Sequence, residues 1–227
     1  MQAGSREALP SARSEATRAA LVRAALDLFG DKGFEATSTR QIAAAAGANI
    51  AAIAYHFGGK DGLRLACADF VVATISELIA GGFDGAERIE SLSAGAARDL
   101  FARVVAAMID GVVARDAVRP IVRFVLREMF EPSPAFERLY AGVMGPTHMK
   151  ACLVWSRATG APVDGEGTRL AVFAMIAQIL YFRVARPAVL RRMNWRDIGP
   201  SEASAIKRVV LANLDAGLDR AARKASP

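Results

Sequence analysis

The sequence is poor in the residue types that build metal sites, disulfide frameworks and β-sheets. It has 2 cysteines and 2 histidines among 227 residues, and aromatic side chains make up only 7%. Cys67 and Cys152 cannot form a disulfide framework, and they match no familiar zinc spacing with His56 and His148. We therefore expect two buried thiols in a reducing compartment, with no metal and no other cofactor.

Long apolar runs are missing as well. The longest, Leu170–Phe182, holds 13 residues, whereas a helix that crosses a membrane needs about 20. The segment Gln2–Thr17 is polar and lacks the apolar core of a signal peptide. These features predict a cytoplasmic protein that has no membrane partner.

Helix-favouring residues are abundant. The chain is 53% hydrophobic, much of it alanine, and no long segment alternates polar and apolar residues as a half-buried strand does. We predict an all-α fold with a glycine-rich loop region at Gly81–Gly95. The expected helices are an amphipathic one through Leu21–Phe29 and others at about 38–46, 49–57, 60–80, 94–114, 120–131, 134–158, 167–186 and 202–223.

Local signals define the ends of the first helices. Gly33 is placed to end the first helix in the left-handed conformation, and Ser38 with Gln41 forms a capping box that opens the second. Gly47 separates the second helix from the third, and Gly58 ends the third. This is the helix-turn-helix arrangement, whose last helix enters the major groove of DNA. The net charge of +6 suits such a polyanion.

A longer string of residues at fixed spacing surrounds this motif. It comprises Thr37-Ser38-Thr39-Arg40-Gln41-Ile42-Ala43, Ala46-Gly47-Ala48-Asn49, Tyr55-His56-Phe57 and Lys60-Asp61-Gly62-Leu63, with Leu28-Phe29 and Lys32-Gly33-Phe34 upstream. Over residues 15–66 the sequence closely resembles the DNA-binding domain of the TetR family of bacterial repressors. Two positions depart from the family pattern: Ala51 replaces its usual glycine, and Ala54 its usual tyrosine.

The second part of the chain resembles the subgroup with a CerR-type C-terminal domain. The resemblance is carried by Arg119–Glu137, by Gln178 and by the segment Arg186–Trp195. It implies a homodimer in which a helix-turn-helix domain precedes an all-helical ligand-binding and dimerisation bundle. The implied function is a repressor that a small-molecule effector releases from a palindromic double-stranded DNA operator.

The domain division follows from this resemblance and from the helix pattern. We expect a flexible tail at 1–13, a helix-turn-helix DNA-binding domain at 14–63 and a ligand-binding and dimerisation domain at 64–227. The long helix that starts at Lys60 is expected to couple the two domains.

Eight residues are candidate DNA contacts: Thr39, Arg40, Asn49, Ile50, Ala51, Tyr55, His56 and Lys60. Thr39 either donates to a phosphate at the positive end of its helix or acts only as a cap. Arg40 either reaches DNA or stays solvated, and Asn49 is favoured as a cap over a reader of adenine. Tyr55, His56 and Lys60 occupy positions where family members contact the DNA backbone. Ile50 and Ala51 offer only apolar groups, so base recognition should depend on thymine methyls and DNA shape.

Seven residues are candidate ligand contacts: Arg123, Arg127, Met144, His148, Trp155, Gln178 and Tyr181. They and Glu128 are embedded in apolar helices, and for each of them except Gln178 a satisfied core or interface residue is the favoured interpretation. Gln178 is the strongest candidate, because a buried amide without a partner costs about 1–3 kcal/mol. A ligand, a neighbouring helix or a dimer mate could provide that partner.

The apolar helix around Leu170–Phe182 also predicts a dimer. It is apolar on nearly every face, so we expect it to be buried all round against a twofold mate. The residues expected to join it in a four-helix interface are Ile206, Val209, Val210, Leu214 and Leu218.

Two other functions compete with this interpretation. An enzyme is disfavoured, because the chain has no Glu-x-x-His, no Walker glycines and no Gly-x-Ser-x-Gly. A helical ligand-binding or scaffold dimer that has lost DNA binding is the alternative, since the recognition helix offers few hydrogen-bonding groups. Arg40, Tyr55, His56 and Lys60 argue against this alternative.

Overall fold

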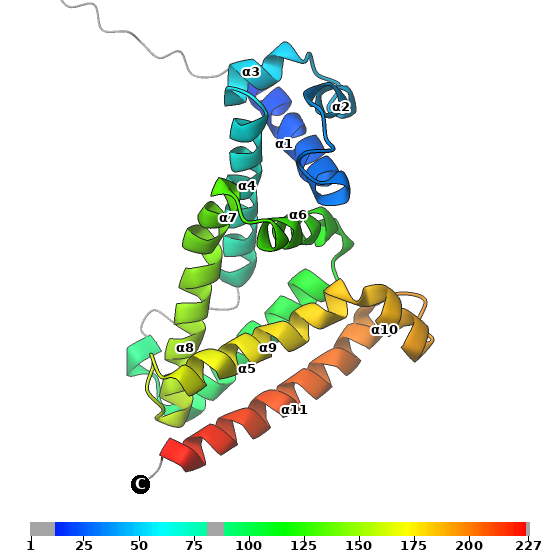
Figure 1. Ribbon diagram of the computed structural model, residues 1–227. Coiled ribbons are helices and arrows are strands. Elements are labelled where there is room, and N and C mark those ends of the chain that lie inside the picture. The colour runs from blue at the N-terminus through cyan, green and yellow to red at the C-terminus, as the bar shows by residue number, and fades with distance from the viewer. Residues whose placement is uncertain (1–11, 81–88, 226–227) are drawn as a thin grey trace, which may run out of the picture. The chain divides into compact units, whose positions relative to one another are not determined.

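The computed structural model describes residues 12–80 and 89–225, and these residues form helices joined by short turns, with no strand among them (Figure 1). The all-α fold predicted from the sequence is confirmed. Contacts within the chain divide it into two compact units. Unit 1 falls within Met1–Val71 and Pro120–Leu139, and unit 2 within Val72–Arg119 and Tyr140–Pro227.

Unit 1 holds the three N-terminal helices, the first part of a long helix and two helices from later in the chain. Their bounds are α1 Ala12–Lys32, α2 Thr39–Ala45, α3 Ala51–Phe57, α4 Lys60–Ala80, α6 Arg119–Phe130 and α7 Pro134–Leu139. Residues 1–11 of the predicted tail lie outside the described residues. Helix α1 begins at Ala12, so it includes the last two residues of that predicted tail. The helix-turn-helix order of α1, α2 and α3 agrees with the sequence prediction.

The ends of the short helices have the predicted local geometry. Gly33 follows α1 with φ at 86° and Gly58 follows α3 with φ at 71°, a backbone conformation that residues with a Cβ rarely adopt. The hydroxyl of Ser38 accepts the Gln41 backbone N–H at 3.2 Å, and the Gln41 side-chain oxygen accepts the Ser38 N–H at 2.8 Å. The capping box is therefore confirmed.

The inner face of α3 anchors it to its neighbours. Ile53 of α3 is almost fully buried, as are Leu21 of α1, Ile42 of α2 and Leu63 of α4. Each such side chain contributes about 1.5–3 kcal/mol when it leaves water. Since α1 contacts both α2 and α3, these apolar groups fix the angle at which α3 presents its other face.

Helix α6 packs against the end of α1 within unit 1. A Cβ atom at Gly30 would lie 3.0 Å from the Cβ of Arg123 and 3.3 Å from the backbone nitrogen of Phe124. A larger residue at this position would require α6 to move by a few tenths of an ångström, so glycine favours the close approach of the two helices. The sequence division had assigned residues 120–139 to the C-terminal domain, whereas their contacts group them with the N-terminal helices.

Unit 2 is a helical bundle. Its elements are η2 Ile89–Ser91, α5 Ala94–Met108, π-helical η3 Ile109–Val113, η4 Asp116–Val118, π-helical η5 Tyr140–Met144, α8 Gly145–Thr159, α9 Glu166–Val184, α10 Arg186–Met193 and α11 Pro200–Ala225. Within the unit α9, drawn in yellow, lies beside α11, drawn in orange to red (Figure 1). The single helix predicted at 134–158 is α7, η5 and α8 end to end, and residues 81–88 of the predicted loop lie outside the described residues.

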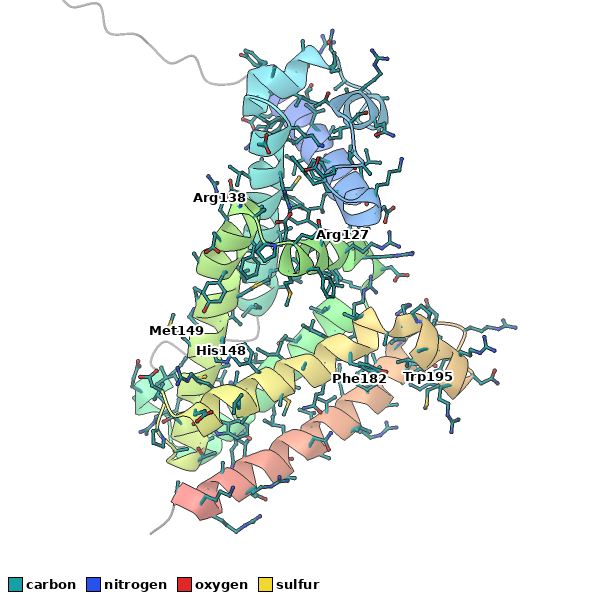
Figure 2. All side chains as sticks on the ribbon, in the orientation of Figure 1. Arg127, Arg138, His148, Met149, Phe182 and Trp195 are labelled. Atoms are coloured by element: carbon teal, nitrogen blue, oxygen red, sulfur yellow. The ribbon has the colours of Figure 1, made fainter. Side chains whose placement is uncertain are left out.

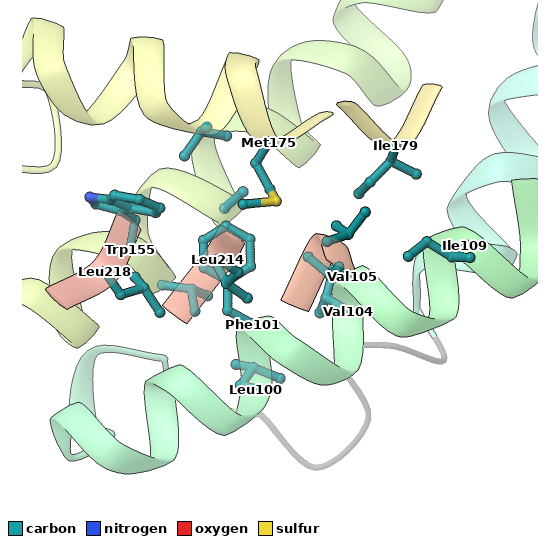
Figure 3. Close-up of a cluster of buried hydrophobic side chains, with 14 of the residues drawn as sticks. Leu100, Phe101, Val104, Val105, Ile109, Trp155, Met175, Ile179, Leu214 and Leu218 are labelled. Atoms are coloured by element: carbon teal, nitrogen blue, oxygen red, sulfur yellow. The ribbon is translucent and has the colours of Figure 1, made fainter. Parts of the chain in front are cut away.

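The core of unit 2 lies among α5, α8, α9 and α11 (Figure 3). Phe101 of α5 and Trp155 of α8 meet edge to face, with ring centroids 6.0 Å apart. Met175 and Ile179 of α9 and Leu214 of α11 complete the cluster. This core holds α9 and α11 together and leaves their outer faces on the surface of the bundle.

One prediction about the last helices is wrong, and the prediction about α9 concerns the dimer. Helix α9 is expected to be buried against a twofold mate, and in the single subunit its residues Leu170, Phe173 and Tyr181 are exposed. The α11 residues expected at a dimer interface are instead core, with the exception of the exposed Val209; the four core residues are Ile206, Val210, Leu214 and Leu218. The spacing of apolar residues correctly indicates which face of α11 is buried. That face packs against α5, α8 and α9 of the same subunit and not against a second subunit.

Helix α10 was not predicted, and the reason is Pro187. A proline that follows a long apolar helix predicts the end of that helix, because proline disrupts a helix at interior positions. In the structure it stands in the first turn of α10, where a missing N–H costs nothing. Asn194 ends α10 in the left-handed conformation, with φ at 55°.

Candidate nucleic-acid interface and ligand site

The outer face of α3 is open to solvent. Tyr55 is 82% exposed, Ile50 is about half exposed, and Ala51 is exposed. His56 is partly buried, and its ring meets that of Tyr55 edge to face at 4.9 Å. A short helix held by its inner face and presenting these groups outwards has the form of a recognition helix.

The residues that precede α3 support the same surface. Thr39 is the first residue of α2, and Arg40 beside it is exposed. The side-chain oxygen of Asn49 accepts the Ala51 backbone N–H at 2.9 Å, so Asn49 caps the start of α3, as the sequence analysis favoured. The side chain of Asn49 is exposed.

Lys60 has a contact that the sequence did not predict. Its ammonium lies 4.0 Å from the centroid of the Phe34 ring, and the guanidinium of Arg64 lies 4.5 Å from the same centroid. Phe34 stands in the turn that follows α1. A cation over an aromatic face is attracted by the electron density of the ring. Lys60 is therefore held close to the end of α3 while it remains partly open to solvent.

Two of the seven candidate ligand residues instead bind the end of α1. Arg123 pairs with Asp31. Arg127, labelled on α6 in Figure 2, donates to the backbone oxygens of Asp31 at 3.2 Å and Gly30 at 3.5 Å. The last carbonyls of a helix lack internal partners and carry partial negative charge, so arginines are favourable there. These contacts give both arginines structural roles within unit 1.

The other five candidate ligand residues lie in unit 2 and do not converge on one point. Met144 ends the π-helical η5 and is partly buried. The His148 ring stacks on Phe173 at 3.9 Å, and its Nε2 lies 3.2 Å from the backbone oxygen of Arg169. Tyr181 is mostly exposed.

Trp155 and Gln178 line a groove between α9 and α11. The groove has a volume of about 480 Å³, and its walls include Met175, Asn213 and Arg220. The Gln178 oxygen accepts from the Asn213 amide at 3.0 Å, and the Gln178 nitrogen lies 2.9 Å from the Met175 sulfur. The partner that Gln178 needed is thus a neighbouring helix, one of the three possibilities left open by the sequence.

A cluster of charges at the junction of α9 and α10 escaped the sequence analysis. Arg183 is buried and lies 3.4 Å from Asp116, which is far from it in the sequence. Burial lowers the pKa of the Arg183 guanidinium, and the nearby charges of Arg186 and Arg119 act in the same direction, while Asp116 opposes them. In the sequence Arg183 is an arginine at the end of an apolar run, a position that is usually exposed to solvent. Only the folded chain shows that this side chain is buried.

Two family models match this chain. The N-terminal model, described as bacterial regulatory proteins of the tetR family, matches residues 21–67. The C-terminal model is that of the HTH-type transcriptional dual regulator CecR, C-terminal domain, and it matches residues 97–220. The HTH-type transcriptional dual regulator CecR of Shigella flexneri is 32% identical over 206 residues, which cover 89% of this chain and 92% of that protein.

The chain belongs to the TetR family. The subgroup expected from the sequence as CerR-type is the one that the second model names CecR. This TetR-family protein is therefore a transcriptional regulator, and its relatives are regulators rather than enzymes. A further relative, RaaS of Mycobacterium tuberculosis, is 50% identical over 52 residues, covering 23% of this chain and 24% of RaaS.

Solved structures share the fold of this TetR-family regulator. A putative transcriptional regulator from Pseudomonas aeruginosa PAO1 has a TM-score of 0.64 at 19% identity, covering 94% of this chain and 100% of its own. AibR, solved in complex with isovaleryl coenzyme A and operator DNA, has a TM-score of 0.63 at 16% identity, covering 87% and 97%.

One helix in the described part of this regulator is long and apolar enough to cross a membrane by length and composition. It is α9, and 28% of its apolar 18-residue stretch is buried within the subunit. The helix is longer than the 13-residue apolar run because charged residues, among them Glu166 and Arg183, extend it at both ends. Among the described residues, no group of three or more potential ligands could hold a metal ion.

Proposed function

We propose that this regulator is a cytoplasmic homodimer that represses transcription from a palindromic operator and is released by a small molecule bound in its helical bundle. The observation that carries the proposal is the outer face of α3, which is open to solvent and anchored by Ile53 from behind. Membership of the TetR family supports DNA as the partner of that face.

The eight candidate DNA contacts have separate roles in this proposal. Thr39, Tyr55, His56 and Lys60 contact phosphates, which position the helix on DNA without reading the sequence. Arg40 reaches a phosphate or a base edge. Ile50 and Ala51 present apolar groups to thymine methyls, and Asn49 mainly fixes the start of α3.

The dimer is supported by the outer face of the bundle. Leu170, Phe173, Tyr181 and Val184 of α9 and Val209 of α11 are all exposed on neighbouring helices. Exposed apolar side chains gathered on neighbouring helices are typical of an interface in a soluble protein. We assign it to a twofold mate rather than to lipid, because α9 carries charges at both ends and belongs to a transcriptional regulator.

Release by an effector requires unequal affinity for the two states of the dimer. A ligand that binds the DNA-incompetent state better by about 1–3 kcal/mol lowers operator affinity some 5–150-fold, and the operator weakens ligand binding by the same factor. Within the bundle, the groove that includes Trp155 and Gln178 offers apolar walls with a few polar groups. Helix α4 runs without interruption from the end of α3 into unit 2, so it is the covalent route for the coupling.

The test is a gel-shift titration of the full chain against the DNA upstream of its own gene, with a scrambled fragment of equal length as competitor. A regulator shifts the specific fragment at concentrations that leave the scrambled one free. Failure to shift either fragment, even at low salt, would favour the alternative, a helical ligand-binding or scaffold dimer that has lost DNA binding, and equal binding of both fragments would contradict operator recognition. Ligand-induced release is tested afterwards, by adding each candidate effector to the preformed complex.

A further inference from the structure

Two arginines of unit 2 converge on one carboxylate oxygen. Arg183 lies in the last turn of α9, and Arg186 is the first residue of α10. One oxygen of Asp116 lies 3.4 Å from a terminal nitrogen of Arg183 and 3.7 Å from one of Arg186. The two guanidinium groups are therefore neighbours, and each receives only a long contact from this shared oxygen.

Each guanidinium also has a buried nitrogen without a partner. Among the described residues, the Nη2 atom of Arg183 and the Nη1 atom of Arg186 are buried and make no hydrogen bond. The Arg183 side chain is 4% exposed, whereas that of Asp116 is 70% exposed. Buried N–H groups in folded proteins almost always have an acceptor. These two unpaired donor atoms, one on the buried Arg183 and one on the half-buried Arg186, point to an acceptor that the described residues do not supply.

The charges around this pair do not balance. Two carboxylates, Asp116 and Asp197, face Arg183 and Arg186, and the charge of the exposed Arg119 adds a third cation close enough to act on Arg183. Asp197 is also occupied, because it pairs with Arg186 and accepts the Ile198 backbone N–H at 2.9 Å. A water molecule would satisfy the free N–H groups but would leave the excess positive charge. An anion satisfies both.

We propose that Arg183 and Arg186 form a binding site for the carboxylate or phosphate group of a small molecule, with one oxygen of the anion accepting from each unpaired nitrogen. Planar guanidinium groups with several donors match such anions in shape and charge. Burial lowers the pKa of the Arg183 guanidinium, while Asp116 raises it. The site is separate from α3 and does not depend on the operator or on an effector in the α9–α11 groove.

The experiment follows thermal unfolding of the full chain while sodium phosphate or sodium acetate replaces sodium chloride at constant ionic strength. A ligand that binds the native state raises Tm along a saturable curve. We expect saturation with at least one of the two anions, and the comparison between them tells whether a phosphate or a carboxylate is preferred. Arg186→Gln, which retains hydrogen-bonding atoms but removes the charge, is expected to weaken the apparent affinity at least about tenfold, the change for one lost charged hydrogen bond.

Two further variants make the outcome decisive. Arg191→Gln changes an exposed arginine on the same helix α10 and should bind the anion as the unaltered protein does. Arg183→Lys keeps the buried charge without the planar fork, so it should fold yet bind more weakly. Equal, non-saturating increases of Tm in all four proteins would mean a general salt effect and would overturn the proposal. No increase with either anion in the unaltered protein would overturn it as well.

Discussion

The guanidinium of Arg64 on α4 donates from Nε to Oε1 of Glu128 on α6, over 2.7 Å. Glu128 is only 2% exposed, and its second oxygen accepts from the Ser133 hydroxyl at 2.6 Å. The same Arg64 lies over the Phe34 ring, which it shares with Lys60. The ion pair between Arg64 and Glu128 therefore connects α6 with the Phe34 ring. The same ring holds Lys60, which begins α4 just after the candidate recognition helix.

Removal of Arg64 should destabilise unit 1. Arg64→Met leaves the buried Glu128 carboxylate with Ser133 as its remaining partner, and loss of one member of such a pair costs about 3 kcal/mol. Urea unfolding of the full chain, monitored by circular dichroism, measures this change. In the double variant Arg64→Met, Glu128→Met, most of the stability should return. A single variant as stable as the unaltered protein would show that the ion pair contributes nothing.

Lys60→Ala should weaken binding to specific and random DNA alike. A phosphate contact contributes no sequence preference, and its loss reduces the slope of log K against log salt by about 1. Fluorescence anisotropy at several salt concentrations gives both quantities. Arg191→Ala, on α10, is the control and should leave the slope unchanged. A changed base preference at unchanged total affinity would show that Lys60 reads bases.

Charges on the outer face of α9 and α11 should separate the subunits. Leu170→Glu with Val209→Glu puts carboxylates into an apolar interface, so sedimentation velocity should show a monomer with unchanged helix content. Met193→Glu changes an exposed apolar side chain of α10 and should leave the dimer intact. Leu214→Arg, by contrast, should unfold the subunit, since Leu214 is fully buried in its own core. A dimer that survives both carboxylates would place the interface elsewhere.

Neither thiol should react while the chain is folded. Burial raises the pKa of the Cys67 thiol, and the nearby Glu128 carboxylate raises it further. Burial also raises the pKa of the Cys152 thiol, and the negative charge of Asp164 adds to that increase. Because the thiolate is the reactive form, a disulfide reagent at pH 8 should label the chain only after denaturant is added. Rapid labelling of Cys67 in the native state would mean that α1 and α4 separate readily, since Cys67 donates to the Val22 backbone oxygen between them.

The features predicted well from the sequence are those fixed by near neighbours in the chain. Gly33, Gly58 and the pair Ser38 and Gln41 act over at most four residues, so the pattern contains all the information. Pro187 shows the limit of such signals, because the same residue can follow a helix or open one.

The features that were missed depend on contacts between distant residues. The sequence did not predict that Arg123 and Arg127 contact Asp31 and Gly30, which lie more than ninety residues earlier. Likewise, the pattern of α11 marks Leu214 as buried but cannot tell a subunit core from a dimer interface. No local signal distinguished Arg183 from a solvated arginine at a helix end.

The central claim, that α3 presents a DNA-reading surface, is tested most directly by selecting fragments of the source genome with the purified full chain and sequencing those retained. We predict enrichment of a palindromic sequence with half-sites about one helical turn apart, as a twofold pair of recognition helices requires. Tyr55→Ala, which changes the most exposed aromatic side chain of α3, should reduce the yield of these fragments. Retention of fragments without any common sequence, equally by the unaltered chain and by Tyr55→Ala, would contradict the claim.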